Sequence, residues 1–153
     1  LEANYRDFHY RIRGFDAHSG PLIDSNLTAW YMPVPGWTLF AGPDFLAKDT
    51  SSPVDSYYQW GARLGVSKTL GKGASLFVLG SYRQRNHRAY SPLFEAKRSD
   101  EILNATAIAR FPVLKFAGLT PEVVVQHTRT ESNIDWLYSY KRTTASVRLS
   151  HAF

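Results

Sequence analysis

The last ten residues, TASVRLSHAF at Thr144 to Phe153, alternate between apolar and polar side chains and end on an aromatic residue. Successive side chains of a β-strand point to opposite faces of the sheet. One face of this segment therefore carries Ala145, Val147 and Leu149, and the other carries Ser, Thr and Arg. The C-terminus of a soluble domain usually frays into water, where a terminal phenylalanine is unfavourable. The pattern favours a last strand whose apolar face meets lipid.

The composition excludes a transmembrane helix. The chain has 153 residues, which predicts one domain over residues 1–153, and 44% of them are hydrophobic at a mean hydropathy of −0.30. The longest wholly apolar run is Leu76 to Leu79, whereas a membrane helix needs about 20 apolar residues. The chain is therefore either soluble or crosses a bilayer in another way.

Charge and reactive side chains narrow the functional classes. The formal charge is +5, but the basic residues are scattered, and the densest group is RQRNHR at Arg83 to Arg88. We expect acidic lipid headgroups or an acidic polypeptide as the counterpart, rather than nucleic acid. Cysteine is absent, which excludes disulfides and thiolate sites. The five histidines lack metal-ligand spacing, so neither a metal nor another cofactor is expected.

Eight segments alternate with period two between clusters of Gly, Pro, Ser and Asp. They are Tyr5–Phe15, Ile23–Met32, Trp37–Leu46, Tyr57–Leu70, Ala74–Asn86, Glu101–Phe111, Glu122–Glu131 and Lys141–Phe153. Their connections alternate between long polar loops, such as KDTSSPVDS, and short turns, such as PVPG. This asymmetry is typical of outer-membrane barrels. The sequence predicts an all-β, transmembrane, antiparallel up-and-down barrel of eight visible strands, either complete or the C-terminal part of a larger barrel.

Alternation by itself does not distinguish a membrane barrel from a soluble one, because the two differ in which face is wet. Three features favour the membrane barrel. Aromatic residues lie near the strand ends, the apolar faces are rich in Ala and Gly, and the chain ends on an aromatic in phase with its apolar face. The residues of this C-terminal barrel signal are Val147, Leu149 and Phe153, with His151 as an interruption.

The polar faces carry arginines that we expect to line a lumen. The predicted lumen-facing residues are Arg11, Arg13, Arg63, Arg83, Arg85, Arg110, Glu122 and Arg148, with Asp7, Asp24 and Glu122 as candidate partners. Such arginines form either a polar channel for a translocating polypeptide or structural ion pairs across strands. Both readings require inward placement, because an arginine facing lipid at mid-membrane costs roughly 2–4 kcal/mol.

Four motifs resemble the barrel end of the surface lipoprotein assembly modifier family. They are KRSDE at Lys97–Glu101, FAGLTP at Phe116–Pro121, SNI at Ser132–Ile134 and YSYKR at Tyr138–Arg142. A weaker likeness reaches back to about Tyr5. The motif residues singled out are Arg98, Asp100, Gly118, Pro121, Ser132, Asn133, Tyr138 and Tyr140.

The resemblance implies a protein of the Gram-negative outer membrane, in which a periplasmic tetratricopeptide-repeat region precedes a larger barrel. Such proteins help to deliver lipoproteins or secreted proteins to the cell surface. The implied partners are outer-membrane lipids, a client lipoprotein or secreted protein, the barrel assembly machinery, and the missing strands or another chain. No helical repeat is present here, and LEANYRDFHY opens without an initiator Met. We therefore expect a fragment or a shortened relative, with Leu1 not the start of the gene.

Several roles remain open for single residues. Gly118 and Pro121 are expected to shape a turn, and Arg98 with Asp100 either cross-links an extracellular loop or receives exported cargo. The alternatives to a translocation component are a passive pore, a small structural barrel and, less favoured, a lipid-modifying enzyme. Adjacent Ser150 and His151 point to opposite faces of a strand and cannot act as nucleophile and base. A loop serine such as Ser132 with His127 stays formally open.

Overall fold

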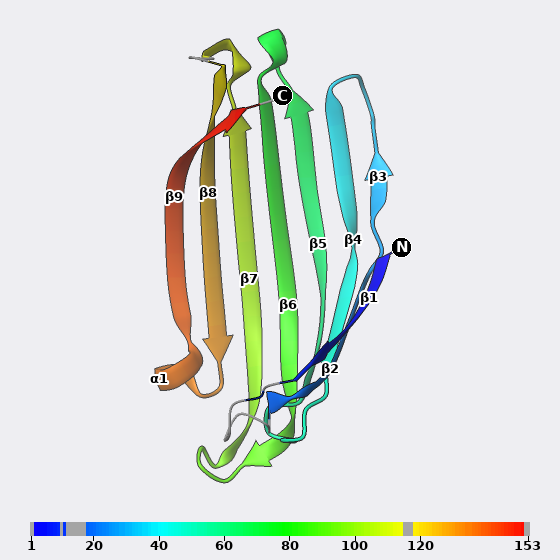
Figure 1. Ribbon diagram of the computed structural model, residues 1–153, viewed down its shortest axis with the longest axis vertical. Coiled ribbons are helices and arrows are strands. Elements are labelled where there is room, and N and C mark those ends of the chain that lie inside the picture. Colours follow the sequence, from blue (N-terminus) through cyan, green and yellow to red (C-terminus); the bar gives the residue numbers. More distant parts are fainter. Residues whose placement is uncertain (1, 10, 12–17, 115–117, 152–153) are drawn as a thin grey trace.

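The computed structural model describes residues 2–9, 11, 18–114 and 118–151 as a single antiparallel sheet with very little helix (Figure 1). The strands are β1 (Glu2–Phe8), β2 (Gly20–Asn26), β3 (Ala29–Tyr31), β4 (Trp37–Lys48), β5 (Tyr57–Thr69), β6 (Ser75–Ser91), β7 (Ala96–Arg110), β8 (Leu119–Ser132) and β9 (Tyr140–His151). The helical turns are η2 (Gly71–Gly73), η3 (Pro112–Leu114) and α1 (Asp135–Tyr138). Within these ranges, no helix has the length and apolar character to cross a membrane.

The strands follow one another in the sheet in the order β1-β2-β4-β5-β6-β7-β8-β9, with β3 also paired to β4. Every pairing is antiparallel between neighbours. This confirms the predicted all-β, up-and-down fold. In the described part of the chain the sheet is curved but not closed, and β1 and β9 form its two edges (Figure 1).

One predicted strand, Ile23–Met32, is divided into β2 and β3 by its partner. The two strands pair with β4 in the same register, so β3 continues the line of β2. Opposite the gap lies Pro43, which has no N–H to donate, although its carbonyl accepts the Leu27 N–H at 3.2 Å. The interruption therefore originates in β4 and not in the segment that it divides.

The strand ends that differ most from the sequence prediction are those of β1, β6 and β7. β1 ends at Phe8, where its ladder with β2 reaches Gly20, and most of the rest of the strand predicted up to Phe15 lies outside the described residues. In contrast, both strands of the β6–β7 hairpin extend into the predicted loop. β6 continues to Ser91 and β7 already begins at Ala96, and the register between them shifts beyond Asn86. The irregularity lets this hairpin continue beyond its neighbours in the sheet.

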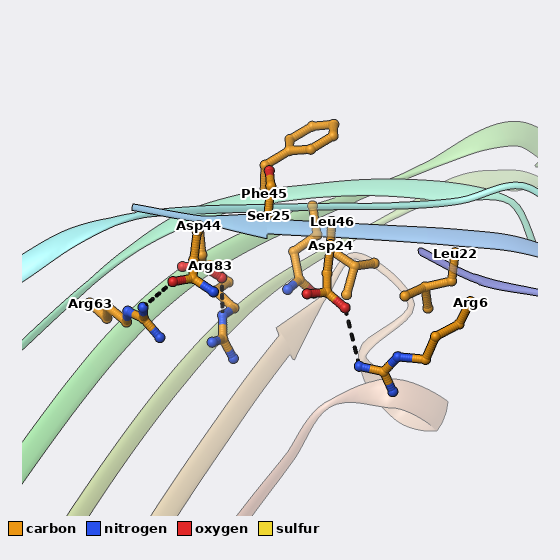
Figure 2. A pocket seen from close by; sticks show the side chains of 11 residues that line it. Arg6, Leu22, Asp24, Ser25, Asp44, Phe45, Leu46, Arg63 and Arg83 are labelled. Atoms are coloured by element: carbon orange, nitrogen blue, oxygen red, sulfur yellow. Dashed lines mark hydrogen bonds and ion pairs between the residues drawn. The ribbon is translucent and has the colours of Figure 1, made fainter. Parts of the chain in front are cut away.

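The sheet has a convex and a concave face. Figure 2 shows Asp24, Asp44 and Arg83 on one side of it and Phe45 on the other. Asp44 of β4 and Arg83 of β6 meet across β5, which requires the sheet to curve toward their side. We call this side the concave face and the side of Phe45 the convex face.

The convex face exposes large apolar side chains, and little of the described chain is a conventional core. The buried hydrophobic residues are Ala74, Val124 and Ile134, whereas Leu64 and Val147 on the convex face are 69% and 70% exposed. The convex apolar belt comprises Ile23, Leu27, Ala29, Tyr31, Leu39, Ala41, Pro43, Phe45, Tyr58, Trp60, Ala62, Leu64, Val66, Leu76, Val78, Gly80, Tyr82, Leu103, Ala105, Ala107, Ala109, Val123, Val125, Ala145, Val147 and Leu149.

The centre of this belt shifts along the strands from one edge of the sheet to the other. On the line of β2 and β3 it is Leu27, which lies level in register, across β4, with Ala62 on β5. On β9 it is Val147, which the register connects back through β8, β7 and β6 to Lys68 on β5. From Ala62 to Lys68 the centre moves by six residues over the six steps from β2 to β9, or about one residue per strand.

Candidate functional site: the polar concave face

The concave face holds a polar furrow made of two adjoining hollows. The first has a volume of about 310 Å³ (Figure 2) and the second about 540 Å³, and both are lined by Leu46, Gln59 and Arg83. The other polar side chains of the furrow are Arg6, Asp24, Asn26, Asp44, Arg63, Arg85, Arg98, Asp100, Asn104, Thr128, Thr130 and Tyr140. Together they extend from β1 to β9.

Glycine on an intervening strand allows side chains two strands apart to meet in the furrow. Asp44, Gly61 and Arg83 lie in register on β4, β5 and β6. Arg83 Nε donates to Asp44 Oδ2 at 2.7 Å. A Cβ on Gly61 would lie 2.7 Å from Arg83 Cγ, so a side chain there would displace the arginine.

The same arrangement recurs one step along the sheet. Arg63 lies opposite Gly42, and its guanidinium passes over that glycine to donate to Asn26 Oδ1 and Thr28 Oγ1. A Cβ on Gly42 would come within 1.8 Å of the Leu27 carbonyl oxygen. Because Gly42 has no side chain, the Leu27 backbone can approach β4, and Arg63 can reach Asn26 and Thr28.

Several concave-face arginines have neutral partners. Arg85 donates to Gln59 Oε1 at 2.9 and 3.1 Å and stacks over the Tyr57 ring at 4.5 Å. Among the described residues, Arg142 and Arg148 have no ion pair.

Basic residues outnumber acidic ones on the concave face. The basic set is Arg6, Lys48, Arg63, Arg83, Arg85, Arg98, Arg110, Arg142 and Arg148, and the acidic set is Glu2, Asp24, Asp44, Asp100 and Glu122.

We call the end of the sheet with the β4–β5, β6–β7 and β8–β9 loops the loop end, and the opposite end, with η2 and η3, the turn end. At the loop end of the furrow, Arg98 pairs with a fully buried carboxylate. Arg98 Nε donates to Asp100 Oδ1 at 2.9 Å and Nη2 lies 2.8 Å from Oδ2, while the Asp100 side chain is 0% exposed. The guanidinium also lies 3.5 Å from the Tyr138 ring centre. At the turn end, Arg110 and Glu122 form a longer pair at 3.4 Å.

The structure brings most of the residues predicted to face a lumen onto one face. Those on the concave face are Arg63, Arg83, Arg85, Arg110, Glu122 and Arg148. Arg11 follows the end of β1 and lies on no strand, because the β1 ladder stops at Phe8, and Arg13 lies outside the described residues. The lumen itself remains a prediction.

The candidate acidic partners divide between the two faces. Asp24 accepts from Arg6 at 3.1 Å and from Asn4 at 3.0 Å. The prediction that Asp7 is a partner of the lumen-facing arginines is wrong. Its position in the β1 ladder assigns it to the convex face, where its carboxylate lies 3.1 Å from His9. Sequence reasoning missed Asp44, because its phase on β4 also contains Phe40 and Leu46 and so has no clear polarity.

The remaining predicted residues lie on the convex face or at the two ends of the sheet. Val147 and Leu149 lie on the convex face, and Phe153 is outside the described residues. Gly118 has a left-handed φ of 82° before β8, and Pro121 pairs with Leu149. At the loop end are Ser132, Asn133, Tyr138 and Tyr140, on or beside the turn between β8 and β9.

The candidate hydrolase residues have other partners. His127 Nδ1 lies 2.8 Å from Thr143 Oγ1 on the convex face, whereas Ser132, in the opposite phase of β8, accepts the Ile134 N–H at 3.3 Å. In residues 2–9, 11, 18–114 and 118–151, no three His, Asp or Glu side chains gather as metal ligands. The excess of basic over acidic side chains on the concave face suits it to bind polar or anionic groups.

Comparisons with known proteins agree with the motifs. A family model described as surface lipoprotein assembly modifier matches residues 1–153. The chain is 34% identical over 154 residues to a protein of Acinetobacter baumannii named hemophilin secretion modulator, and the match covers 100% of this chain and 31% of that protein. The chain thus spans about a third of the length of this relative. No solved structure matches.

Proposed function

Because the chain belongs to the surface lipoprotein assembly modifier family, we propose that it forms part of a transmembrane β-barrel in the Gram-negative outer membrane. This barrel helps to deliver lipoproteins or secreted proteins to the cell surface and performs no chemistry of its own. The convex face meets lipid, and the polar furrow lines the lumen.

The observation that carries the membrane proposal is the shift of the convex belt. A flat slab of hydrocarbon cuts tilted strands at a different residue on each strand. A shift of about one residue per strand, with about 3.3 Å between residues and about 4.8 Å between strands, corresponds to a strand tilt of about 35°. Strands of outer-membrane barrels tilt by about 35–45°. A soluble sheet has no reason to maintain such a slope in its exposed apolar residues.

The height and the chemistry of the belt agree with this proposal. On β5 the belt runs from Tyr58 to Val66, which corresponds to about 22 Å along the membrane normal at that tilt, close to the apolar band of about 25 Å on outer-membrane barrels. Between the ends of the belt on each strand, every convex-face position is uncharged, and Ser25 on β2 is the one polar side chain among them. At its turn end the Lys68 amine lies 4.3 Å from the Trp37 ring centre, and Trp and Lys are typical anchors at a membrane interface.

The open edges require further strands. Unpaired backbone groups of β1 and β9 are not tolerated in hydrocarbon. We therefore propose that other strands, from the rest of a longer protein or from another chain, complete the ring. The route of an unfolded client is the completed lumen, with a lateral seam at the first and last strands as a finer hypothesis.

A gene deletion in the native bacterium tests this function. Surface proteins are compared by protease shaving, and secreted proteins are compared in the culture medium, before and after deletion. Loss of at least one surface lipoprotein or secreted protein, with its cellular amount retained and its export restored by the full-length gene, supports the proposal. An unchanged surface and medium in the deletion strain overturns it. The protein whose export is lost defines the client.

A further inference from the structure

Two loops that are distant in the sequence pack together at the loop end of the sheet. Phe94, at the tip of the hairpin between β6 and β7, contacts Trp136 with a centroid distance of 6.2 Å and Tyr138 with one of 5.8 Å. Both contacts are edge-to-face, with interplanar angles of 64° and 82°. This geometry is favourable between aromatic rings. The packed rings join the β6–β7 hairpin to α1.

The family-motif residues hold this arrangement in place. Arg98 connects the two loops because it pairs with buried Asp100 and stacks on Tyr138 at 3.5 Å. Asn133 bonds the β7 backbone on both sides of Arg98: its Oδ1 accepts the Ser99 N–H at 2.8 Å, and its Nδ2 donates to the Lys97 carbonyl at 2.9 Å. We call Arg98, Asp100, Asn133 and Tyr138 the loop clamp.

The clamped loops present apolar side chains to the outside. Leu93 is 82% exposed, Trp136 is 76% exposed and Leu137 is 47% exposed. Large apolar side chains exposed together on adjoining loops are typical of an interaction site, and a tryptophan held by ring packing is a typical binding anchor. We call Leu93, Phe94, Trp136 and Leu137 the loop platform.

Lipid is a poor candidate for covering the platform. On β8 the convex belt ends at Val125, and the strand continues for seven residues to Ser132 before α1 begins. At the tilt derived above, this extension is about 19 Å along the membrane normal. The headgroup layer extends only about 5–8 Å beyond the hydrocarbon on each side. The platform therefore lies outside the bilayer if the convex belt marks the hydrocarbon.

We propose that the loop platform binds the exported client on the extracellular side, through an apolar segment or patch of that client. This inference rests on the proposed function. The occupant follows from continuity, because Arg98 and Asp100 of the loop clamp also line the furrow. A polypeptide that leaves the furrow at its loop end meets the platform next. Since the clamp holds the rings in position, binding costs little ordering of the loops.

Photo-crosslinking tests the contact in the native bacterium with the full-length protein. The crosslinking amino acid p-benzoylphenylalanine replaces Trp136 or Leu93, and the probe is the client defined by the deletion experiment. The control position is Leu114, which is 63% exposed on η3 at the opposite end of the sheet. Cross-links to the client from Trp136 and Leu93, and not from Leu114, support the proposal. Cross-links confined to other parts of the same protein, or no cross-link to the client, overturn it.

Surface variants test the consequence. Trp136→Ser with Leu93→Ser should reduce client export by about tenfold or more, the effect of losing an anchor residue, while Leu114→Ser should leave it unchanged. Leu93→Ser serves as the milder variant. Retention of the heat-modifiable, folded barrel on gels verifies folding. Export at the wild-type level from both platform variants, in a strain whose gene deletion abolishes export, overturns the platform and leaves the proposed function intact. Unchanged export on deletion removes the proposed function itself.

Discussion

The two faces of this sheet use the same strands in opposite ways. On the convex face, side chains diverge, and small residues such as Ala105 and Gly80 alternate with exposed Leu and Val. On the concave face, side chains converge, so that Arg83 reaches Asp44 across an intervening strand. Curvature brings charges together on one side and keeps apolar groups apart on the other. The concave, polar face is therefore the one whose side chains hold one another in place, whereas in a soluble barrel the concave face is the apolar one.

The largest expected effect follows from removing one partner of the most buried ion pair on the concave face. Arg98→Leu leaves the Asp100 carboxylate, 0% exposed, without its counter-ion and should destabilise the folded protein by about 3–5 kcal/mol. Urea unfolding of the full-length protein refolded in lipid vesicles measures the change. The double variant Arg98→Leu with Asp100→Leu is the control and should recover much of the loss, because no charge stays unpaired. A single variant as stable as wild type contradicts the assignment.

The next effect compares two neighbours on β9 that point to opposite faces. Val147→Arg brings a charge into the centre of the convex belt and should cost about 2–4 kcal/mol in lipid vesicles. Ser146→Arg, one residue earlier and on the concave face, should change the stability by less than about 0.5 kcal/mol. Equal costs for the two variants would contradict the assignment of lipid to the convex face.

A smaller effect on stability is expected from substituting glycine, and it differs between Gly61 on the concave face and Gly80 on the convex face. Gly61→Ala introduces a Cβ 2.3 Å from the Tyr82 carbonyl oxygen and 2.7 Å from Arg83 Cγ, so it should cost about 1–3 kcal/mol and separate Arg83 from Asp44. Gly80→Ala on the convex face has no atom within 4 Å of the new Cβ and should be nearly neutral. Unfolding in the same vesicles distinguishes the two, and a neutral Gly61→Ala would refute close packing across β5.

The smallest effect concerns pH at the loop end, beyond the belt. Burial, with Arg98 and Arg85 nearby, lowers the pKa of His87 below its usual value of 6.5, and its Nδ1 lies 2.9 Å from the Val54 carbonyl oxygen. As the pH falls, the unfolded state therefore binds this proton before the folded state does. The contribution of neutral His87 to the stability of the fold is complete above the unfolded pKa and decreases as the pH falls below it.

Hydrogen exchange measures this response. Protection of the amides in residues 50–57, corrected for intrinsic exchange, should decrease between pH 7.5 and pH 5. His87→Gln should flatten the dependence, because glutamine does not titrate in this range. A pH dependence that is the same in both proteins would assign the effect to another group.

Part of this fold could be predicted from single segments and part could not. The alternation in Trp37–Leu46 or Glu101–Phe111 depends on neighbouring residues in one strand, so it indicated strand and apolar face directly. The break between β2 and β3 could not be seen in Ile23–Met32, because its cause is Pro43 on the partner strand. The end of β1 at Phe8 likewise depends on the length of the ladder with β2.

The same division applies to the candidate site. Polar phases of the strands predicted that Arg63, Arg83 and Arg85 share a face. Their partners were not predictable, because Asp44 meets Arg83 only through the register of three strands and the missing side chain of Gly61. The four residues of the loop clamp were singled out by motif, but the contact between Arg98 and Tyr138 joins residues that are far apart in the chain.

The sequence by itself determined the strand pattern, the opposition of an apolar and an arginine-bearing face, and the family. These properties are local, because the two-residue period of a strand and the order of residue types in a motif are read along the chain. The tertiary structure alone decided the open curved sheet, the slope of the convex belt and the pairing of each arginine. These depend on register and curvature, which exist only once separate segments lie side by side.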